Sequence, residues 1–214
     1  MNKIILVGAG GHGKVVLDAL LKLGSFDVLG FIDSNRELKE IMGIKVMGDD
    51  QVLESLFRSG CAHAFVSVGS VGDPKLRMKL AGQLRFIGFD LPAIVHPAAV
   101  VARGVNIGEG AFIAAGAVIG PDSKIGRNAI INTNASVDHD CNIGDFVHIA
   151  PGVTLSGGVE VGEGAHLGSG AAVIEYKRIG AGTVVGAGSV VVSDLPAKSK
   201  AYGVPCRVAG EQRG

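Results

Sequence analysis

The sequence predicts an α/β domain over residues 1–91, followed by a parallel β-helix with a C-terminal tail over residues 92–214. Two patterns indicate this fold class. Up to Leu91, short apolar runs alternate with helix-like segments, whereas every sixth residue from Val95 to Val191 is Val, Ile or Leu. Alternating strand and helix patterns favour a parallel sheet covered by helices. A short period kept without insertion favours a solenoid of stacked coils.

The α/β domain follows from six segments in the order strand, helix, strand, helix, strand, helix. The apolar runs that predict strands are residues 3–10, 26–33 and 62–70. The segments with helical spacing of apolar residues are 13–24, 51–60 and 73–84. This order predicts a small parallel sheet with its helices on the faces.

The stretch GAGGHGK at residues 8–14 follows the first predicted strand and opens the first predicted helix. Backbone N–H groups at a helix N-terminus can bind a phosphate. The glycine spacing fits a dinucleotide fingerprint, but His12 crowds the loop and the domain is short for that fold. Asp33, at the end of the second strand, could reach a ribose or base. A tight turn without a ligand is the alternative.

The β-helix follows from the content of each six-residue unit. The first position is a large aliphatic residue, the fifth is small or β-branched, and the fourth is often Gly or Asn, as at Gly104 and Asn128. Gly and Asn tolerate the positive φ that a sharp turn requires. Each unit therefore predicts one wall of a triangular coil of eighteen residues. Because the narrow prism leaves much outer surface for subunit contacts, we expect a homo-oligomer.

Composition and charge indicate which partners and compartments to expect. The 214 residues include 20 Lys and Arg and 20 Asp and Glu, so the net charge is zero and nucleic acid is not expected as a partner. No export signal or membrane-spanning stretch is visible, which favours the cytoplasm. The three cysteines, Cys61, Cys141 and Cys206, lie far apart in the sequence. This spacing favours reduced thiols over disulfides or a zinc site.

His139 is the main candidate for a catalytic residue. In the unit VDHDCN, Val137 and Cys141 take the inward positions, which leaves His139 on an outward corner between Asp138 and Asp140. Flanking carboxylates orient an imidazole and raise its proton affinity, as a general base requires. A surface histidine without a catalytic function is the alternative.

Residues eighteen apart should stack on neighbouring coils, and Gly157 stands in that relation to His139. A backbone N–H without a side chain beside it would then lie about 4.8 Å from the base, where it could stabilise an oxyanion. His148 and His166 are also eighteen apart. Three histidines on neighbouring coils leave a metal site as an alternative. His139 has a different position in its unit, however, and no compact ligand cluster is evident, so no metal is predicted.

Several motifs together resemble the NeuD/PglD-type sugar acetyltransferases of the hexapeptide-repeat acyltransferase superfamily. The motifs are GAGGHGKVV, FID, VSVG, AIVHP, INTNASVDHDCNIGDFVHIAPG and YGVPCRVAG, and with the repeat they cover nearly the whole chain. The resemblance implies left-handed coils, a homotrimer and acetyl-CoA bound by the β-helix between subunits. It also implies a Rossmann-like first domain that binds a nucleotide sugar.

The resemblance further implies roles for individual residues. His139 is similar to the catalytic base, Asp140 to its acidic neighbour, and Asn132 to a polar residue of the active site. His148 is similar to a group near the acetyl thioester. The residues that match the nucleotide-sugar loop are Gly8, Gly11, His12 and Asp33.

We expect the pantetheine arm of acetyl-CoA to run along the coils that follow His139. Gly157, Gly168 and Gly186 should offer backbone with little side-chain cover there. Positive charge gathers beyond them and could bind the CoA phosphates, with a solvated basic tail as the alternative. The residues that carry this charge are Lys177, Arg178, Lys198, Lys200 and Arg207.

The unit VIEYKR at residues 173–178 departs from the repeat. Ile174, Tyr176 and Lys177 stand where other units carry Gly, Gly and a small residue. A regular wall is therefore not expected to continue through this unit. Lys177 or Arg178 could instead turn outward near the path of CoA.

These observations predict an acetyl-CoA-dependent N-acetyltransferase that acts on the amino group of a nucleotide-linked amino sugar in bacterial glycan synthesis, such as a UDP-4-amino-4,6-dideoxyhexose. Two alternatives stay open. One is O-acetylation of a sialic acid or another sugar, by the same site chemistry. The other is a nucleotide-sugar-binding or scaffold protein without catalytic activity, in which the carboxylates beside His139 would have no purpose.

Overall fold

The computed structural model describes residues 1–35 and 37–211, and no helix within these ranges is long and apolar enough to cross a membrane. The chain divides into two compact units. The α/β unit contains Met1–Gly69 and Lys75–Pro97. The β-helix unit contains Ser70–Pro74 and the chain from Ala98 onward, in which residues 212–214 lie outside the described residues.

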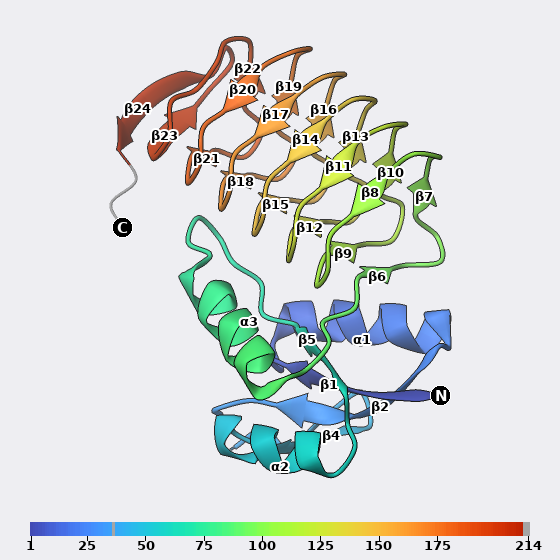
Figure 1. Ribbon diagram of the computed structural model, residues 1–214. Helices are drawn as coiled ribbons and strands as arrows, with labels where there is room; N and C mark the ends of the chain where they lie inside the picture. Colours follow the sequence, from blue (N-terminus) through green and yellow to red (C-terminus); the bar gives the residue numbers. More distant parts are fainter. Residues whose placement is uncertain (36, 212–214) are drawn as a thin grey trace. The chain divides into compact units, whose positions relative to one another are not determined.

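A five-stranded sheet forms the centre of the α/β unit, in the order β3-β4-β2-β1-β5 (Figure 1). All its pairs are parallel except β3 with β4. The strands of this unit are β1 (Asn2–Val7), β2 (Phe26–Ile32), β3 (Glu40–Ile41), β4 (Ile44–Gly48), β5 (His63–Val66) and β6 (Ile94–Val95). The helices are α1 (Gly11–Leu23), the 3-10 helix η1 (Asp50–Val52), α2 (Leu53–Arg58) and α3 (Lys75–Ile87). The expected order of strands and helices is present, with β3 and β4 added after β2.

Apolar side chains of the parallel strands and of the inner helix faces form the core of the α/β unit. Ile4 and Ile5 of β1 point to opposite faces of the sheet and are both fully buried, as expected for a strand covered on both faces. Leu17 and Leu20 of α1 are also fully buried, because apolar residues three apart share one helix face. This core fixes the carboxyl ends of β1 and β2, from which the glycine loop and Asp33 extend.

Short strands on three walls make up the β-helix unit (Figure 1). The first wall contains β7 (Val100–Val101), β10 (Val118–Ile119), β13 (Ser136–Val137), β16 (Thr154–Leu155), β19 (Ala172–Val173) and β22 (Val190–Val191). The second wall contains β8 (Asn106–Ile107), β11 (Lys124–Ile125), β14 (Asn142–Ile143), β17 (Glu160–Val161) and β20 (Arg178–Ile179). The third wall contains β9 (Phe112–Ile113), β12 (Ile130–Ile131), β15 (His148–Ile149), β18 (His166–Leu167), β21 (Val184–Val185), β23 (Ser199–Tyr202) and β24 (Arg207–Glu211).

Neighbouring short strands of a wall pair in parallel at an interval of one coil, which is eighteen residues. Val118 pairs with Ser136, and His148 pairs with His166. From Ile113 to Val191, the aliphatic first residue of each unit, such as Val137, is buried in a continuous core. The predicted fold class, an α/β domain followed by a left-handed parallel β-helix of hexapeptide repeats, is confirmed.

Each wall ends in a tight turn in which one residue has a left-handed backbone conformation. We call the turns after the first wall the first corner, and those after the third wall the third corner. In the first corner the left-handed residues include Asp140 (φ 58°), Gly158 (φ 68°) and Tyr176 (φ 56°). Gly and Asp are common in this conformation, whereas a bulky residue such as Tyr is an outlier.

The expected interruption of the repeat at residues 173–178 is wrong. β19 and β20 flank this unit, and both pair in register with the preceding coil. Tyr176 adopts the left-handed turn, and Lys177 takes the fifth position while remaining half-buried. The stacked coils therefore impose their backbone on a unit whose residue types do not favour it.

Candidate active site

His139 lies in the first corner, on the turn between β13 and β14. Its side chain is 50% exposed, and its backbone N–H donates to Oδ1 of Asp138 at 2.8 Å. Nδ1 of the ring lies 2.7 Å from Oδ2 of Asp140. Because a carboxylate only accepts hydrogen bonds, Nδ1 carries a proton and donates a hydrogen bond to Asp140. Nε2 is then the ring atom that can accept a proton from a substrate.

The neighbouring carboxylates raise the pKa of His139 above the ordinary value for a histidine. The hydrogen bond to Asp140 has the largest effect, and the negative charges of Asp138 and Asp140 add to it, while partial desolvation opposes it. All three effects follow from whether a neighbour favours or disfavours the imidazolium. The pair therefore strengthens His139 as a proton acceptor.

Gly157 lies beside the ring of His139 on the next coil. The N–H of Gly158 donates to the carbonyl oxygen of His139 at 2.9 Å and holds the two turns in register. A Cβ added to Gly157 would lie 2.6 Å from both Cε1 and Nε2 of the ring, so only glycine fits there without displacing it. Among the described residues, none accepts a hydrogen bond from the N–H of Gly157. The base therefore has an open backbone donor next to it.

A second polar cluster surrounds His148, which is buried on the third wall. Nδ1 of His148 lies 2.6 Å from the carbonyl oxygen of Ser70, and Nε2 lies 3.1 Å from Nδ2 of Asn132. The N–H of Thr133 donates to Oδ1 of Asn132 at 2.8 Å, which turns Nδ2 of the amide towards the ring. Nε2 of His148 therefore accepts a hydrogen bond and Nδ1 donates one. The ring in this arrangement is neutral.

The stacking of His148 and His166 is as expected from their spacing. Their ring centroids lie 4.9 Å apart in a T-shaped arrangement. His139 stands on the first corner, so the three histidines do not converge. Within residues 1–35 and 37–211, no group of three or more His, Cys, Asp or Glu side chains could hold a metal ion.

The residues expected at the catalytic centre and along CoA divide between two corners. His139, Asp140 and Gly157 belong to the first corner. Asn132 belongs to the third corner, where Gly168 and Gly186 lie on later coils. A described hydrogen bond joins Asn132 to His148, while none joins it to His139. One chain thus holds two polar clusters that are separated by the width of the first wall.

The glycines expected to expose their backbone differ from one another. A Cβ added to Gly168 would lie 2.5 Å from the backbone nitrogen of Ala187, so this glycine serves the close stacking of coils. The ring of Tyr202 packs against Gly186. Open backbone beside a functional group is therefore found at Gly157, whereas Gly186 is covered, contrary to the expectation.

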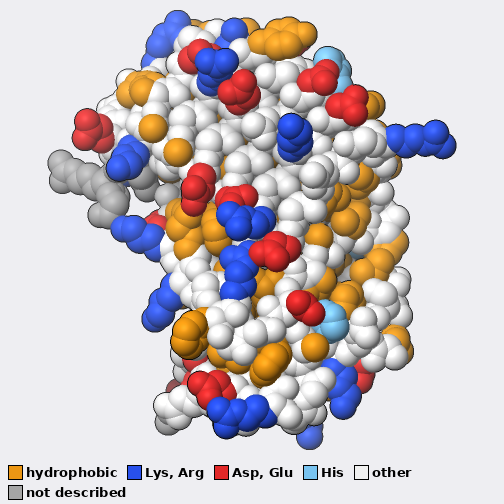
Figure 2. Space-filling view, in the orientation of Figure 1, with side chains coloured by type: hydrophobic (Ala, Val, Ile, Leu, Met, Phe, Trp, Pro, Cys, Tyr) orange, Lys and Arg blue, Asp and Glu red, His pale blue; other side chains and the backbone are white. Residues whose placement is uncertain are grey.

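Two of the basic residues expected at the CoA phosphates, Arg178 and Arg207, contact other groups of the protein. Nε of Arg178 lies 3.3 Å from Oε2 of Glu160, and Nη1 of Arg207 donates to the carbonyl oxygen of Cys206 at 3.0 Å. Figure 2 shows charged side chains of both signs scattered over the visible face, without a single basic patch. Charge pairs of this exposed kind are weak and leave Arg178 able to exchange partners.

In the α/β unit, Asp33 ties the glycine loop to the carboxyl end of β2. Its Oδ2 accepts from the N–H of Ala9 at 2.7 Å, and its Oδ1 accepts from the N–H of Asn35 at 2.9 Å. Gly8 has a φ of 111°, and a Cβ there would lie 3.0 Å from the backbone nitrogen of Val68. Both residues therefore determine the shape of the loop.

His12 lies in the first turn of α1 and is largely but not fully buried. Burial lowers its pKa to about 4, and the positive charge of Arg77 contributes to the lowering. The ring is therefore neutral at pH 7 and supplies no positive charge to a bound anion. Lys14, whose side chain carries a positive charge at pH 7, lines a cavity of about 360 Å³ together with Gly10 and Gly11.

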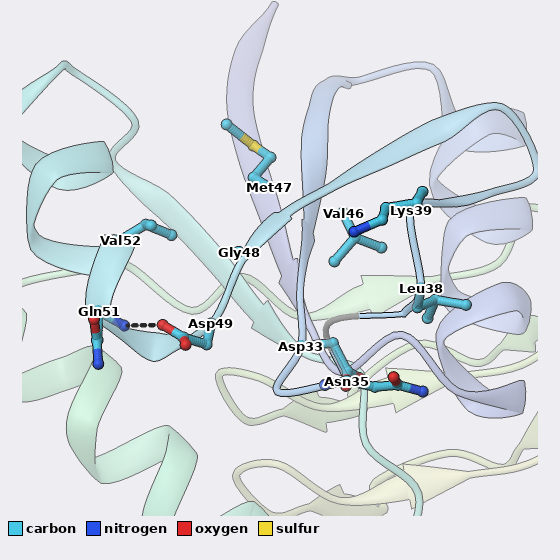
Figure 3. A pocket seen from close by; sticks show the side chains of 10 residues that line it. All are labelled: Asp33, Asn35, Leu38, Lys39, Val46, Met47, Gly48, Asp49, Gln51 and Val52. Atoms are coloured by element: carbon cyan, nitrogen blue, oxygen red, sulfur yellow. Dashed lines mark hydrogen bonds between the residues drawn. The ribbon is translucent and has the colours of Figure 1, made fainter.

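A second cavity, of about 390 Å³, opens where β2 and β4 end (Figure 3). Asp33 and Asn35 follow β2 and line one part of it, and Asp49 and Gln51 follow β4 and line another. Ligands of open α/β sheets bind outside the carboxyl ends of the strands. The polar lining and its place at the strand ends make this cavity the candidate site for a base or ribose.

Comparison with known proteins shows the family. Residues 3–84 match the PglD N-terminal domain, and residues 104–139, 122–157 and 140–175 match the bacterial transferase hexapeptide repeats. A perosamine N-acetyltransferase from Caulobacter crescentus, crystallised with CoA and GDP-perosamine, is 44% identical. The match covers 99% of this chain and 98% of that chain, with a TM-score of 0.93. The chain belongs to the PglD-type sugar acetyltransferases.

Two further structures support this membership. The acetyltransferase domain of PglB from Neisseria gonorrhoeae FA1090 is 35% identical over 97% of this chain and 100% of that chain, with a TM-score of 0.91. WeeI from Acinetobacter baumannii AYE is 27% identical over 97% of this chain and 100% of that chain, with a TM-score of 0.87. Among curated protein sequences, no match was found. The predicted family and enzyme class are confirmed.

The candidate sites of the two units also contain residues that were not expected. Ser70 accepts a hydrogen bond from His148, and Asn35, Asp49 and Gln51 line the cavity at the strand ends. The last three had a usable signal, since each lies within three residues of the end of a strand. Ser70 had none, because its partner lies 78 residues away in the sequence.

Proposed function

We propose that this sugar acetyltransferase transfers the acetyl group of acetyl-CoA to the amino group of a GDP-linked amino sugar. The observation that carries the proposal is the His139–Asp140 pair beside the open N–H of Gly157. The relative that is 44% identical over nearly the whole chain was crystallised with CoA and GDP-perosamine. This relative favours GDP over the UDP expected from the sequence.

In the proposed reaction, the amine nitrogen of the sugar attacks the carbonyl carbon of the thioester. Nε2 of His139 accepts a proton from that nitrogen, and Asp140 stabilises the imidazolium through Nδ1. The N–H of Gly157 donates to the carbonyl oxygen as negative charge develops on it. The carbon–sulfur bond then breaks, and the proton held by His139 passes to the thiolate of CoA. Structures of the relative in which one histidine is replaced by asparagine or by alanine support a histidine at the centre of the reaction.

The two cavities of the α/β unit support a nucleoside diphosphate as the part of the substrate that this unit binds. They share Leu38 in their linings and are therefore neighbours. The guanine and ribose would occupy the cavity lined by Asn35 and Gln51. The diphosphate would lie at Gly11 and Lys14, where the N-terminus of α1 and a lysine both favour negative charge. Gly8, His12 and Asp33 would hold the loop in the shape that this arrangement needs.

We also infer that the active form is a homotrimer in which acetyl-CoA lies between subunits. His139 and the Asn132–His148 cluster stand on different corners, so a second chain is needed to bring the two clusters to one thioester. The first wall presents exposed apolar side chains for such a contact, with Val100 61% and Val118 42% exposed. Lys177 and Arg178 would lie on the side of the CoA phosphates. Light scattering during gel filtration tests the trimer, and a monomer with full activity would overturn it.

We place the enzyme in the cytoplasm. Cys61, Cys141 and Cys206 are free thiols in the structure, as is usual for proteins of a reducing compartment. Fractionation of cells that express the protein with its natural sequence measures this location directly. Recovery in a compartment other than the cytoplasm would overturn the assignment.

A thiol-release assay tests the reaction. We expect release of CoA and a product heavier by one acetyl group with GDP-perosamine, at a kcat/KM about 10-fold or more above that for a UDP-linked amino sugar. A GDP-linked hexose with a hydroxyl in place of the amine should give no acetylated product. A preference for the hydroxyl sugar would instead indicate O-acetylation. Binding of GDP-perosamine without turnover would indicate a binding or scaffold protein.

A further inference from the structure

Tyr176 has a left-handed backbone conformation, which is unfavourable for a tyrosine. Its side chain is largely exposed, so packing does not offset this cost. Its φ is 56°, at the turn position that Asp140 and Gly158 occupy on the two preceding coils. Its side chain is 72% exposed. A strained residue without a packing role points to a function of the side chain at that place.

The rings of Tyr176 and His139 both belong to the first corner, on turns two coils apart, with the Gly157–Gly158 turn between them. A Cβ added to Gly158 would lie 2.6 Å from Cε1 of Tyr176, just as one added to Gly157 would lie 2.6 Å from Nε2 of His139. The two glycines are consecutive, so their Cα atoms are about 3.8 Å apart. The N–H of Tyr176 donates to the carbonyl oxygen of Gly157 at 3.0 Å and fixes this stacking. The two rings thus approach one glycine pair from the coils on either side.

The geometry of the proposed reaction brings the acyl group to this turn. The amine nitrogen must lie about 3 Å from Nε2 of His139 to lose its proton, and about 3 Å from the carbonyl carbon to attack it. The acyl carbon is then within roughly 6 Å of Nε2, over Gly157 and Gly158. A substituent on that carbon therefore reaches the neighbourhood of the Tyr176 ring.

We infer that Tyr176 is a specificity-determining residue that limits the acyl donor to a short acyl group. Its ring fills space over Gly158 into which a longer acyl chain would extend, while the methyl of an acetyl group stops short of it. One methylene in an apolar pocket changes kcat/KM by about 10- to 200-fold. This inference rests on the proposed acetyl transfer and adds a limit on chain length to it.

The test compares acetyl-CoA, propionyl-CoA and butyryl-CoA as donors with one amino sugar. In Tyr176→Gly, we expect the ratio of kcat/KM for propionyl-CoA to that for acetyl-CoA to rise about 10-fold or more. Glycine suits a φ of 56°, so this variant keeps its fold, which a thermal midpoint at or above that of the parent verifies. Tyr176→Phe keeps the ring and should keep the parent's ratio.

Phe146 provides a matched control for the backbone change. It is an aromatic residue at the same position of its unit, with a φ of 57°, but on a turn of the second wall away from His139. Phe146→Gly should leave the donor ratio and the turnover of acetyl-CoA unchanged. A raised ratio in this variant as well would trace the effect to backbone relaxation and overturn the inference.

The remaining outcomes separate the inference from the proposed function. An unchanged ratio in Tyr176→Gly with acetyl transfer intact would overturn the role of Tyr176 and leave the acetyltransferase proposal standing. Loss of turnover with all three donors would make Tyr176 a residue needed for the reaction itself, and would also overturn the inference. Failure of the parent enzyme to use any acyl-CoA would overturn the proposed function.

Discussion

The first corner and the third wall of the β-helix are built from one repeat, yet they hold their histidines in opposite ways. His139 is half exposed and its hydrogen bonds go to its sequence neighbours Asp138 and Asp140. His148 is buried between Asn132 and Ser70, and both of its ring nitrogens are engaged. An outward-pointing histidine of the β-helix can therefore have a reactive ring in a turn, as at His139, or a fixed ring on a wall, as at His148.

The two histidines differ most in the surroundings of Nε2. Nε2 of His139 faces a backbone without side-chain cover at Gly157, whereas Nε2 of His148 already accepts a hydrogen bond from Asn132. A general base needs a free lone pair within reach of the substrate's proton. This difference supports His139 as the proposed base, with His148 positioning neighbouring groups.

Replacement of the reactive ring should have the largest effect. We expect His139→Ala to lower kcat by about 100-fold or more with a modest change in KM for acetyl-CoA, because the proton acceptor is lost while the donor keeps its contacts. The thermal midpoint should change little, since the ring is half exposed. Steady-state kinetics and a melting curve measure both, and near-normal turnover would remove His139 from the mechanism.

Displacement of the same ring should have a smaller effect. Gly157→Ala places a methyl group 2.6 Å from Cε1 and Nε2 of His139, so the ring must turn away. We expect kcat to fall about 10-fold or more, since misplacement of a catalytic group by about 1 Å can cost as much as 100-fold. Gly82→Ala, in α3 with no atom within 4 Å of the added Cβ, is the matched control and should keep full activity. Equal kinetics for the two variants would contradict the contact between Gly157 and His139.

Replacement of His148, the fixed ring, should lower stability strongly and activity only slightly. His148→Ala leaves the carbonyl of Ser70 and the amide of Asn132 without their partner and creates a cavity. We expect the free energy of unfolding to fall by about 2–3 kcal/mol, while kcat falls only about 3- to 5-fold. Chemical denaturation and steady-state kinetics provide the two numbers. A loss of kcat as large as that of His139→Ala, at unchanged stability, would erase the distinction between the two histidines.

The comparison also explains what the sequence could and could not reveal. The six-residue period predicted the fold because every coil repeats the same inward positions, and the pair His139–Asp140 was predictable because its members are adjacent. The bond between His148 and Ser70 spans 78 residues and depends on how a loop returns to the third wall. The residue types around Tyr176 led to a wrong prediction of an interrupted repeat. Hydrogen bonds to the neighbouring coils determine the backbone conformation there.

The smallest effect that we predict concerns the pH dependence of the reactive corner. His139 must be neutral to accept a proton, and the hydrogen bond to Asp140 raises its pKa, so kcat/KM falls as the pH drops through that raised value. Asp140→Asn keeps an oxygen that accepts from Nδ1 but removes the negative charge, and thereby lowers the pKa of His139. The acidic limb of the kcat/KM profile should therefore move to lower pH, with only a few-fold loss of kcat on the plateau. Asn132 donates to His148 and has no described hydrogen bond to His139, so Asn132→Leu should leave the acidic limb in place. If the acidic limb does not move in Asp140→Asn, the titrating group is not His139. The chemical difference between the first corner and the third wall would then be unsupported.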